Sequence, residues 1–236
     1  MKNQYFGDIN DFKKYGLLRL LTRGGEINTA ACWMLTPDDG RGDGGFIDYL
    51  KHPDKWRNFD ALLFDHLREL VQTHNLRDVR GAESSAILPN CRFAPGVLPD
   101  DAGGRVRYTE SFMDIAQGCD LVFFDPDNGM EVKSKPCGRK GSSKYLYWCE
   151  IGRFWEAGHS LLIYQHFPRV PRDPFIEAVA RELIRKTGAS EVTSFRTSHV
   201  VFLLVPQEDQ LDTFRRRSRV VEEVWGQQIQ VAYHLR

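Results

Sequence analysis

The 236-residue sequence has no long hydrophobic run, and its first residues include no apolar segment of the kind found in secretory signal peptides. No stretch approaches the roughly 20 apolar residues that a membrane-spanning helix requires. These absences predict a cytoplasmic protein without a membrane partner.

Neither sign of charge is in excess, because 32 Lys and Arg residues balance 32 Asp and Glu residues. Global charge therefore indicates no particular partner, and a nucleic-acid partner has to be inferred from local patches. The five cysteines are odd in number, scattered and without a C-x-x-C pair. This pattern favours free thiols in a reducing compartment over a disulfide framework.

The sequence also lacks internal repeats and low-complexity linkers. Its length and its hydrophobic content of 42% are ordinary for one large globular domain with its own core. We therefore predict a single domain over residues 1–236. It would carry a helical extension at 1–28 and a C-terminal helix with an edge segment at 207–236.

Apolar runs alternate with segments of helical periodicity along the chain. Strands are predicted at 29–35, 78–88, 106–109, 121–124, 160–164, 191–195, 199–205 and 229–234. Helices are predicted at 11–21, 59–73, 111–117, 145–156, 174–187 and 209–225. This alternation predicts an α/β fold with a doubly wound, mostly parallel sheet, an N-terminal helix and a terminal antiparallel hairpin.

A buried strand that ends in acidic residues is the most informative feature of the chain. Residues 121–124 read Leu-Val-Phe-Phe and lead directly into Asp125, Pro126, Asp127 and Asn128. Ligands bind at the carboxyl ends of strands in open α/β sheets, so the chemistry is expected there. The predicted catalytic residues are the polar residues at this edge together with the histidine that follows the next buried strand: Asp125, Asp127, Asn128 and His166.

The order of elements over 29–206 resembles that of the class I S-adenosylmethionine-dependent methyltransferases. The resemblance rests on the acid-proline pair at 125–126, on a helix leading to a strand after Gly158, and on the terminal hairpin. A more remote similarity is to the adenine-N6 methyltransferases of large-subunit ribosomal RNA. Their N-terminal helix carries an Asp-x-x-Lys pattern similar to that over 11–14.

The resemblance implies methyl transfer from S-adenosylmethionine to a nitrogen acceptor, with nucleic acid as the partner. Asp125 would then orient the acceptor amine and Asn128 would assist. The implied cofactor contacts come from the N-terminal helix, the first glycine-rich loop and the second strand: Lys14, Tyr15, Asp38, Asp39, Gly40 and Glu83. The sequence departs from the family at position 128, where it has Asn instead of a base-stacking Tyr, and in the glycine loop over 38–45, which is off pattern.

A basic loop follows the acidic motif. Residues 133–144 carry five basic side chains and no acidic one, and Gly, Ser and Pro separate them. Such a loop beside a site can hold the phosphates of a nucleic acid. The predicted substrate-binding residues are Lys133, Lys135, Arg139, Lys140 and Lys144.

Two alternatives remain open at this stage. The surplus of acids at one sheet edge also suits a Mg²⁺- or Mn²⁺-dependent nuclease or phosphohydrolase, because both metals prefer oxygen ligands. Its candidate ligands are Asp38, Asp39, Asp125, Asp127 and Glu131. The second alternative is a Rossmann-like binding module that has lost catalysis. The sequence leaves the oligomeric state open.

Overall fold

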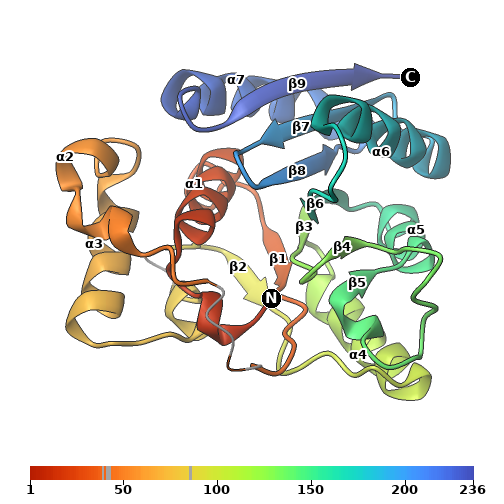
Figure 1. Cartoon of the computed structure of the whole chain (residues 1–236). Helices are drawn as coiled ribbons and strands as arrows, with labels where there is room; N and C mark the ends of the chain where they lie inside the picture. The colour runs from red at the N-terminus through yellow and green to blue at the C-terminus, as the bar shows by residue number, and fades with distance from the viewer. Residues whose placement is uncertain (39, 41–43, 85–86) are drawn as a thin grey trace.

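The computed structural model describes residues 1–38, 40, 44–84 and 87–236, and shows an α/β fold (Figure 1). The helices are α1 Ile9–Thr22, α2 Pro53–Trp56, α3 Ala61–Arg68, α4 Ala102–Ala116, α5 Trp148–Glu156, α6 Arg172–Thr187 and α7 Leu211–Trp225. The strands are β1 Thr29–Cys32, β2 Cys91–Phe93, β3 Leu121–Phe124, β4 Gly129–Met130, β5 Tyr145–Leu146, β6 Ser160–His166, β7 Glu191–Arg196, β8 Val200–Val205 and β9 Gln230–Leu235. Short helical turns η1 Asn3–Tyr5, η2 Asp48–Lys51, η3 Glu69–Thr73, η4 Val79–Ala82, η5 Ser142–Lys144 and η6 Glu208–Gln210 connect them.

Seven strands form one mixed sheet in the order β2-β1-β3-β6-β8-β7-β9. The strands β2, β1, β3 and β6 are parallel, with Ala31 opposite Phe123 and Phe123 opposite Leu162. The remaining pairs are antiparallel, because the hairpin returns β8 between β6 and β7 and β9 adds to the outer side of β7. The prediction of a mostly parallel sheet was therefore too simple, since half of the strand pairings within this seven-stranded sheet are antiparallel.

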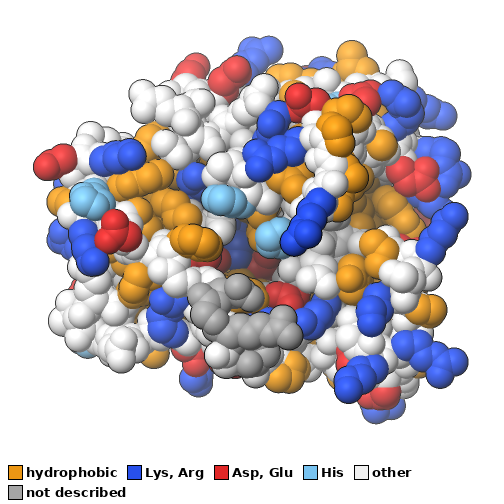
Figure 2. All heavy atoms as spheres, viewed as in Figure 1, with side chains coloured by type: hydrophobic (Ala, Val, Ile, Leu, Met, Phe, Trp, Pro, Cys, Tyr) orange, Lys and Arg blue, Asp and Glu red, His pale blue; other side chains and the backbone are white. Residues whose placement is uncertain are grey.

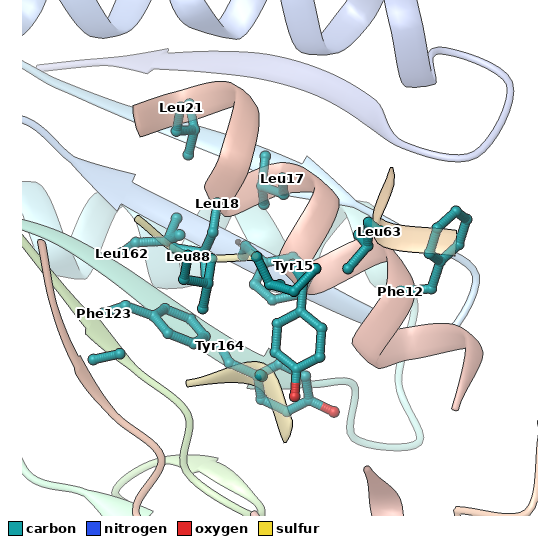
Figure 3. Packing of buried hydrophobic residues seen from close by; sticks show 14 of the residues in the cluster. Phe12, Tyr15, Leu17, Leu18, Leu21, Leu63, Leu88, Phe123, Leu162 and Tyr164 are labelled. Carbon is teal, nitrogen blue, oxygen red and sulfur yellow. The ribbon is translucent and has the colours of Figure 1, made fainter. Parts of the chain in front are cut away.

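Helices cover both faces of the sheet, and the strand residues alternate between the two cores. Leu121 and Phe123 face the core under α1, α3 and α7, whereas Val122 and Phe124 face the core under α4, α5 and α6. Figure 3 shows side chains of α1 packed towards Phe123 and Leu162 of the sheet. Burial on both faces explains why the strand over 121–124 is apolar at every position.

The N-terminal helix α1 is capped at its start and closely packed in its middle. The side chain of Asp8 caps it by accepting hydrogen bonds from the backbone N–H groups of Asn10 and Asp11. In its middle, a Cβ at Gly16 would lie 2.4 Å from the ring of Trp225, so only glycine allows α7 this close approach. The predicted helix at 11–21 is confirmed, and it begins two residues earlier.

Two sequence predictions about local structure were wrong. The segment 102–116 forms the single helix α4 instead of a strand at 106–109 and a helix at 111–117; Asp101 caps it by accepting from Gly104 N–H. The predicted strand at 78–88 contains the helical turn η4, and the strand that pairs with β1 is the three-residue β2. A strand this short leaves too few residues for a periodic pattern to be recognised.

Candidate functional site

A cavity of about 490 Å³ opens at the carboxyl ends of β3 and β6. Figure 2 shows a hollow on this face, with acidic and basic side chains at its floor and histidines at its edge. The cavity is lined by Met1, Lys2, Tyr5, Asp8, Asn10, Asp11, Lys14, Gly44, Phe46, Asp125, Pro126, Asp127, Asn128, Lys144, Tyr164, His166 and His199. The four predicted catalytic residues are thus brought together with the start of α1.

Lys14 lies at the floor of the cavity and bridges two buried carboxylates. Its Nζ donates to Asp125 Oδ2 at 2.6 Å and to Asp11 Oδ1 at 2.7 Å, and it lies 3.1 Å from Met1 Sδ. All three charged side chains are about 97% buried. The ion pairs therefore tie α1 to the end of β3, and the buried charges are compensated within the cluster.

The pKa values in this cluster follow from burial and from the excess of acids. Burial acts to lower the pKa of Lys14, but Asp11 and Asp125 outweigh it, so the pKa of Lys14 is raised and the ammonium stays charged. Burial raises the pKa of Asp125, against the opposing effect of Lys14. Burial and the nearby charge of Asp11 raise the pKa of Asp8 to about 7.

The turn after β3 places Asp127 and Asn128 in the lining of the cavity. Asp127 Oδ2 lies 3.5 Å from Lys144 Nζ and 3.9 Å from Lys2 Nζ. Asn128 is exposed, and its backbone N–H donates to the carbonyl of Lys144. Asn128 is therefore accessible to a ligand, whereas the Asp127 side chain is only 6% exposed and Asp125 Oδ2 is held by Lys14.

Gln165 fixes the shape of this turn. Its side-chain oxygen accepts a hydrogen bond from the backbone of Met130, and its amide donates to the carbonyl of His166. Gly129 has a φ of +108°, and a Cβ there would lie 2.4 Å from the Gln165 amide. The turn that carries Asp127 thus depends on a glycine at this position.

His166 and His199 form one wall of the cavity. Partial burial lowers the pKa of His166, although Asp127 and Asp125 act in the opposite direction. Partial burial and the positive charges of Lys13 and Arg172 lower the pKa of His199. Both rings are therefore predominantly neutral near pH 7, and a neutral imidazole can accept a proton.

The basic loop contributes only one of its five predicted side chains to the cavity. Lys144 lines it, whereas Lys133, Lys135, Arg139 and Lys140 are exposed and lie outside its lining. The end of the loop is fixed by Asp100, whose carboxylate accepts from the backbone N–H groups of Gly141 and Ser143. This contact holds Lys144 near Asp127.

The predicted cofactor residues are dispersed in the structure. Lys14 lines the cavity, but Tyr15 is fully buried and donates to Asp11 Oδ2, which makes it a core residue. Asp38 is exposed and accepts from the backbone of Gln4, and Glu83 accepts from Trp33 Nε1. Gly40 is exposed with a φ of +66° and lies outside the cavity lining. Asp39 lies outside the described residues.

The candidate metal ligands that the structure describes, all but Asp39, do not gather into one site. Asp125 and Asp127 pair with lysines, Asp38 lies outside the cavity lining, and Glu131 accepts from the backbone of Trp148 at the start of α5. In the described part of the chain, no three His, Cys, Asp or Glu side chains are arranged to hold a metal ion.

Sequence reasoning missed several residues that line the cavity, all from segments before β1 or from loops: Lys2, Tyr5, Asp8, Asn10 and Phe46. The Asp8 cap was the one available signal, because an acidic residue before an apolar helix marks a helix start. The side-chain oxygen of Asn10 is buried without a hydrogen-bond partner. Because Asn10 also lines the cavity, its side chain is a candidate ligand contact.

No family model, no curated protein and no solved structure matches this chain. Within the ranges that the structure describes, no helix is long and apolar enough to cross a membrane.

Proposed function

We propose that the chain is a methyltransferase-like enzyme with a doubly wound sheet, and that it transfers a methyl group from S-adenosylmethionine to a nitrogen atom in nucleic acid. The observation that carries the proposal is the position of Asp125-Pro126. The pair follows β3 directly and lines the cavity at the carboxyl ends of the parallel strands. This is the arrangement that the resemblance in sequence implies.

The strand order supports the same proposal. The chain places β2 on one side of β1 and β3 on the other, so the order reverses between β1 and β3. Such a reversal creates the crevice in which open α/β sheets bind their ligands. The cavity volume of about 490 Å³ is in the range of small-molecule and cofactor sites.

The cavity side chains suit the charges of S-adenosylmethionine. That molecule carries a carboxylate, an ammonium group and a positively charged sulfonium. Lys144, whose side chain is partly exposed, offers a cation to the carboxylate, and the side-chain oxygen of Asn10 can accept from the ammonium group. The surrounding carboxylates of Asp8 and Asp11 favour a bound cation.

The chain's own residues would act on the acceptor as follows. Asp127 and the exposed Asn128 both line the cavity, where they can accept hydrogen bonds from an amine and orient its lone pair. His166, with its lowered pKa, can take the proton that the nitrogen loses on methylation. Asp125 keeps Lys14 in place by accepting a hydrogen bond from its Nζ. The bound cofactor would supply the electrophilic methyl group.

A thermal-shift titration with S-adenosylhomocysteine tests cofactor binding. At about a hundred times its dissociation constant, a specific ligand stabilises the fold by about 2.7 kcal/mol. We expect Asn10→Ala to weaken this shift, and Asn58→Ala, a control at an exposed asparagine, to retain it. No shift in the unmodified protein would overturn the proposal. A shift with Mn²⁺ alone would instead favour the metal-dependent alternative.

Methyl transfer is tested with labelled S-adenosylmethionine and pools of RNA and DNA. Asp127→Asn is expected to reduce incorporation by about 10²-fold, because a reacting group misplaced by about 1 Å costs that much in rate. Asp212→Asn, at an exposed acid of α7, is the matched control and should be unchanged. Equal incorporation by both variants would contradict the role of Asp127.

A further inference from the structure

An exposed aromatic ring stands at the rim of the cavity. The side chain of Phe46 is 63% exposed although it belongs to the cavity lining. Its ring lies nearly parallel to that of His199, with an interplanar angle of 12° and 6.2 Å between the ring centroids. Together Phe46 and His199 form a pair of stacked rings, which we call the rim platform.

The rim platform is presented by a fixed backbone. The carbonyl of Phe46 accepts from the N–H of Ile9 at 3.0 Å, and the carbonyl of Gly44 accepts from Arg77. Gly44 has a φ of +82°, and a Cβ there would lie 2.4 Å from Tyr5. The backbone beside Phe46 is therefore held in one position, and an exposed ring on a fixed backbone can contact a ligand at a small entropic cost.

A basic groove continues from the cavity at the same rim. It shares His166 and His199 with the cavity and is further lined by residues 167–172, among them Arg169 and Arg172. Arg172 stacks over the ring of Phe167, with 5.1 Å from its guanidinium to the ring centroid. The groove thus offers guanidinium groups next to the aromatic surface.

The cavity and the groove differ in their balance of charge. Acids that line the cavity pair with lysines, as Asp11 and Asp125 do with Lys14, whereas the described lining of the groove has arginines and no acidic residue. The neutral base of a nucleotide therefore suits the cavity, and its phosphates suit the groove. An exocyclic amine on that base would find acceptors at Asp127 and Asn128.

We propose that the rim platform stacks an unpaired base of single-stranded nucleic acid, with the adjoining phosphates on Arg169 and Arg172. Phe46 thereby supplies the aromatic surface that position 128 lacks. Single strands are the fitting substrate because the ring can reach only a base whose face is free of its neighbours. This inference rests on the proposed methyltransferase function and specifies its substrate class.

Fluorescence anisotropy with labelled 15-nucleotide oligodeoxyadenylate and oligoriboadenylate tests the platform directly. Removal of one stacking ring weakens single-strand binding by about tenfold or more. We expect this loss for Phe46→Ala and near-normal binding for Phe46→Trp. Tyr233→Ala, at an exposed aromatic residue of the edge strand β9, is the matched control and should bind normally. Equal affinity of Phe46→Ala and the unmodified protein would overturn the proposal.

A second measurement separates stacking from phosphate contact. An oligonucleotide with one 2-aminopurine should be quenched on binding, and Phe46→Ala should abolish that quenching. Arg172→Gln should keep it but flatten the salt dependence, by about 0.7 in slope for each lost phosphate contact. Absence of oligonucleotide binding with an intact S-adenosylhomocysteine shift would overturn only the platform. Oligonucleotide binding without that shift would overturn the methyltransferase assignment.

Discussion

Lys14 Nζ and Asp125 Oδ2 are 2.6 Å apart, although the two residues are separated by 111 positions in the sequence. The pair joins the N-terminal helix to the end of a central strand. It is buried at the base of the cavity, and Lys14 also contacts Asp11. The N-terminal helix is thus part of the candidate site itself as well as a cover for the sheet.

This shared lysine predicts an asymmetric response to mutation. Lys14→Met leaves both Asp11 and Asp125 without their cation and should cost about 3–5 kcal/mol of unfolding free energy. Asp125→Asn leaves Lys14 paired with Asp11 and should cost clearly less. Urea unfolding of both single variants and of the double variant measures the coupling. Equal costs for the two single variants would show that Asp11 does not share the lysine.

The raised pKa of Asp8 predicts a pH dependence of stability. The folded chain binds this proton more tightly than the unfolded chain, because the pKa rises from 3.8 to about 7. The associated stability is fully present below the unfolded pKa and is lost as the pH rises through about 7. The free energy of unfolding should therefore fall between about pH 4 and about pH 7, through this group, by a few kcal/mol.

Asp8→Asn isolates that effect, because asparagine is an equally good helix N-cap but does not titrate. Urea unfolding at about pH 5 and about pH 8 should show a smaller loss of stability for this variant than for the unmodified protein. Asp101→Asn, at the cap of α4, is the matched control. Parallel pH profiles for Asp8→Asn and the unmodified protein would contradict the assignment.

Alanine substitutions at Gly129 and Gly158 separate the cost of a steric clash from the cost of backbone strain. Gly129 and Gly158 both have positive φ values, +108° and +90°, but only Gly129 has a neighbour within the reach of a Cβ, at 2.4 Å. Gly158→Ala should cost about 1 kcal/mol from backbone strain. Gly129→Ala should cost about 1–3 kcal/mol more from the clash with Gln165. Similar costs for the two variants would indicate that Gln165 moves aside.

The buried guanidinium of Arg105 should be essential for the segment that carries Lys144. It pairs with Glu150 and also donates to the carbonyls of Ser142 and Tyr145. Arg105→Met should destabilise the fold by about 3–5 kcal/mol, since it leaves Glu150 without its cation. Arg80→Met, at an exposed arginine, should change stability by about 0.5 kcal/mol or less. Thermal unfolding of both variants compares the two positions.

The sequence predicted the regular elements that carry a clear pattern. The strand at 121–124 was recognised because every residue is apolar, and the helices at 174–187 and 209–225 because their periodicity is continuous. The hairpin and the last edge strand were also found. Elements with weak patterns were not predicted correctly. The single helix α4 was divided, since its glycines and exposed Val106 obscure the period.

The candidate site was predictable only in part. A polar run after a buried strand identified residues 125–128 because ligands bind at that edge of such sheets. The partners could not be read from the sequence. Lys14 was singled out by the family resemblance alone, Asp8 looks like an ordinary position before a helix, and Phe46 looks like an isolated apolar residue in a loop. Their proximity to Asp125 arises from packing between distant segments.

The sequence by itself thus determined the alternation of strands and helices, both buried faces of the central strand, and the acidic end at Asp125. These features depend on local patterns of polarity, and local patterns are written into consecutive residues. Tertiary structure alone decided that Lys14 neutralises Asp125, that Glu131 caps a helix, and that Phe46 meets His199 at the rim. Such pairings depend on how α1 and the loops pack against the sheet. No local sequence pattern encodes a contact between residues that are far apart in the chain.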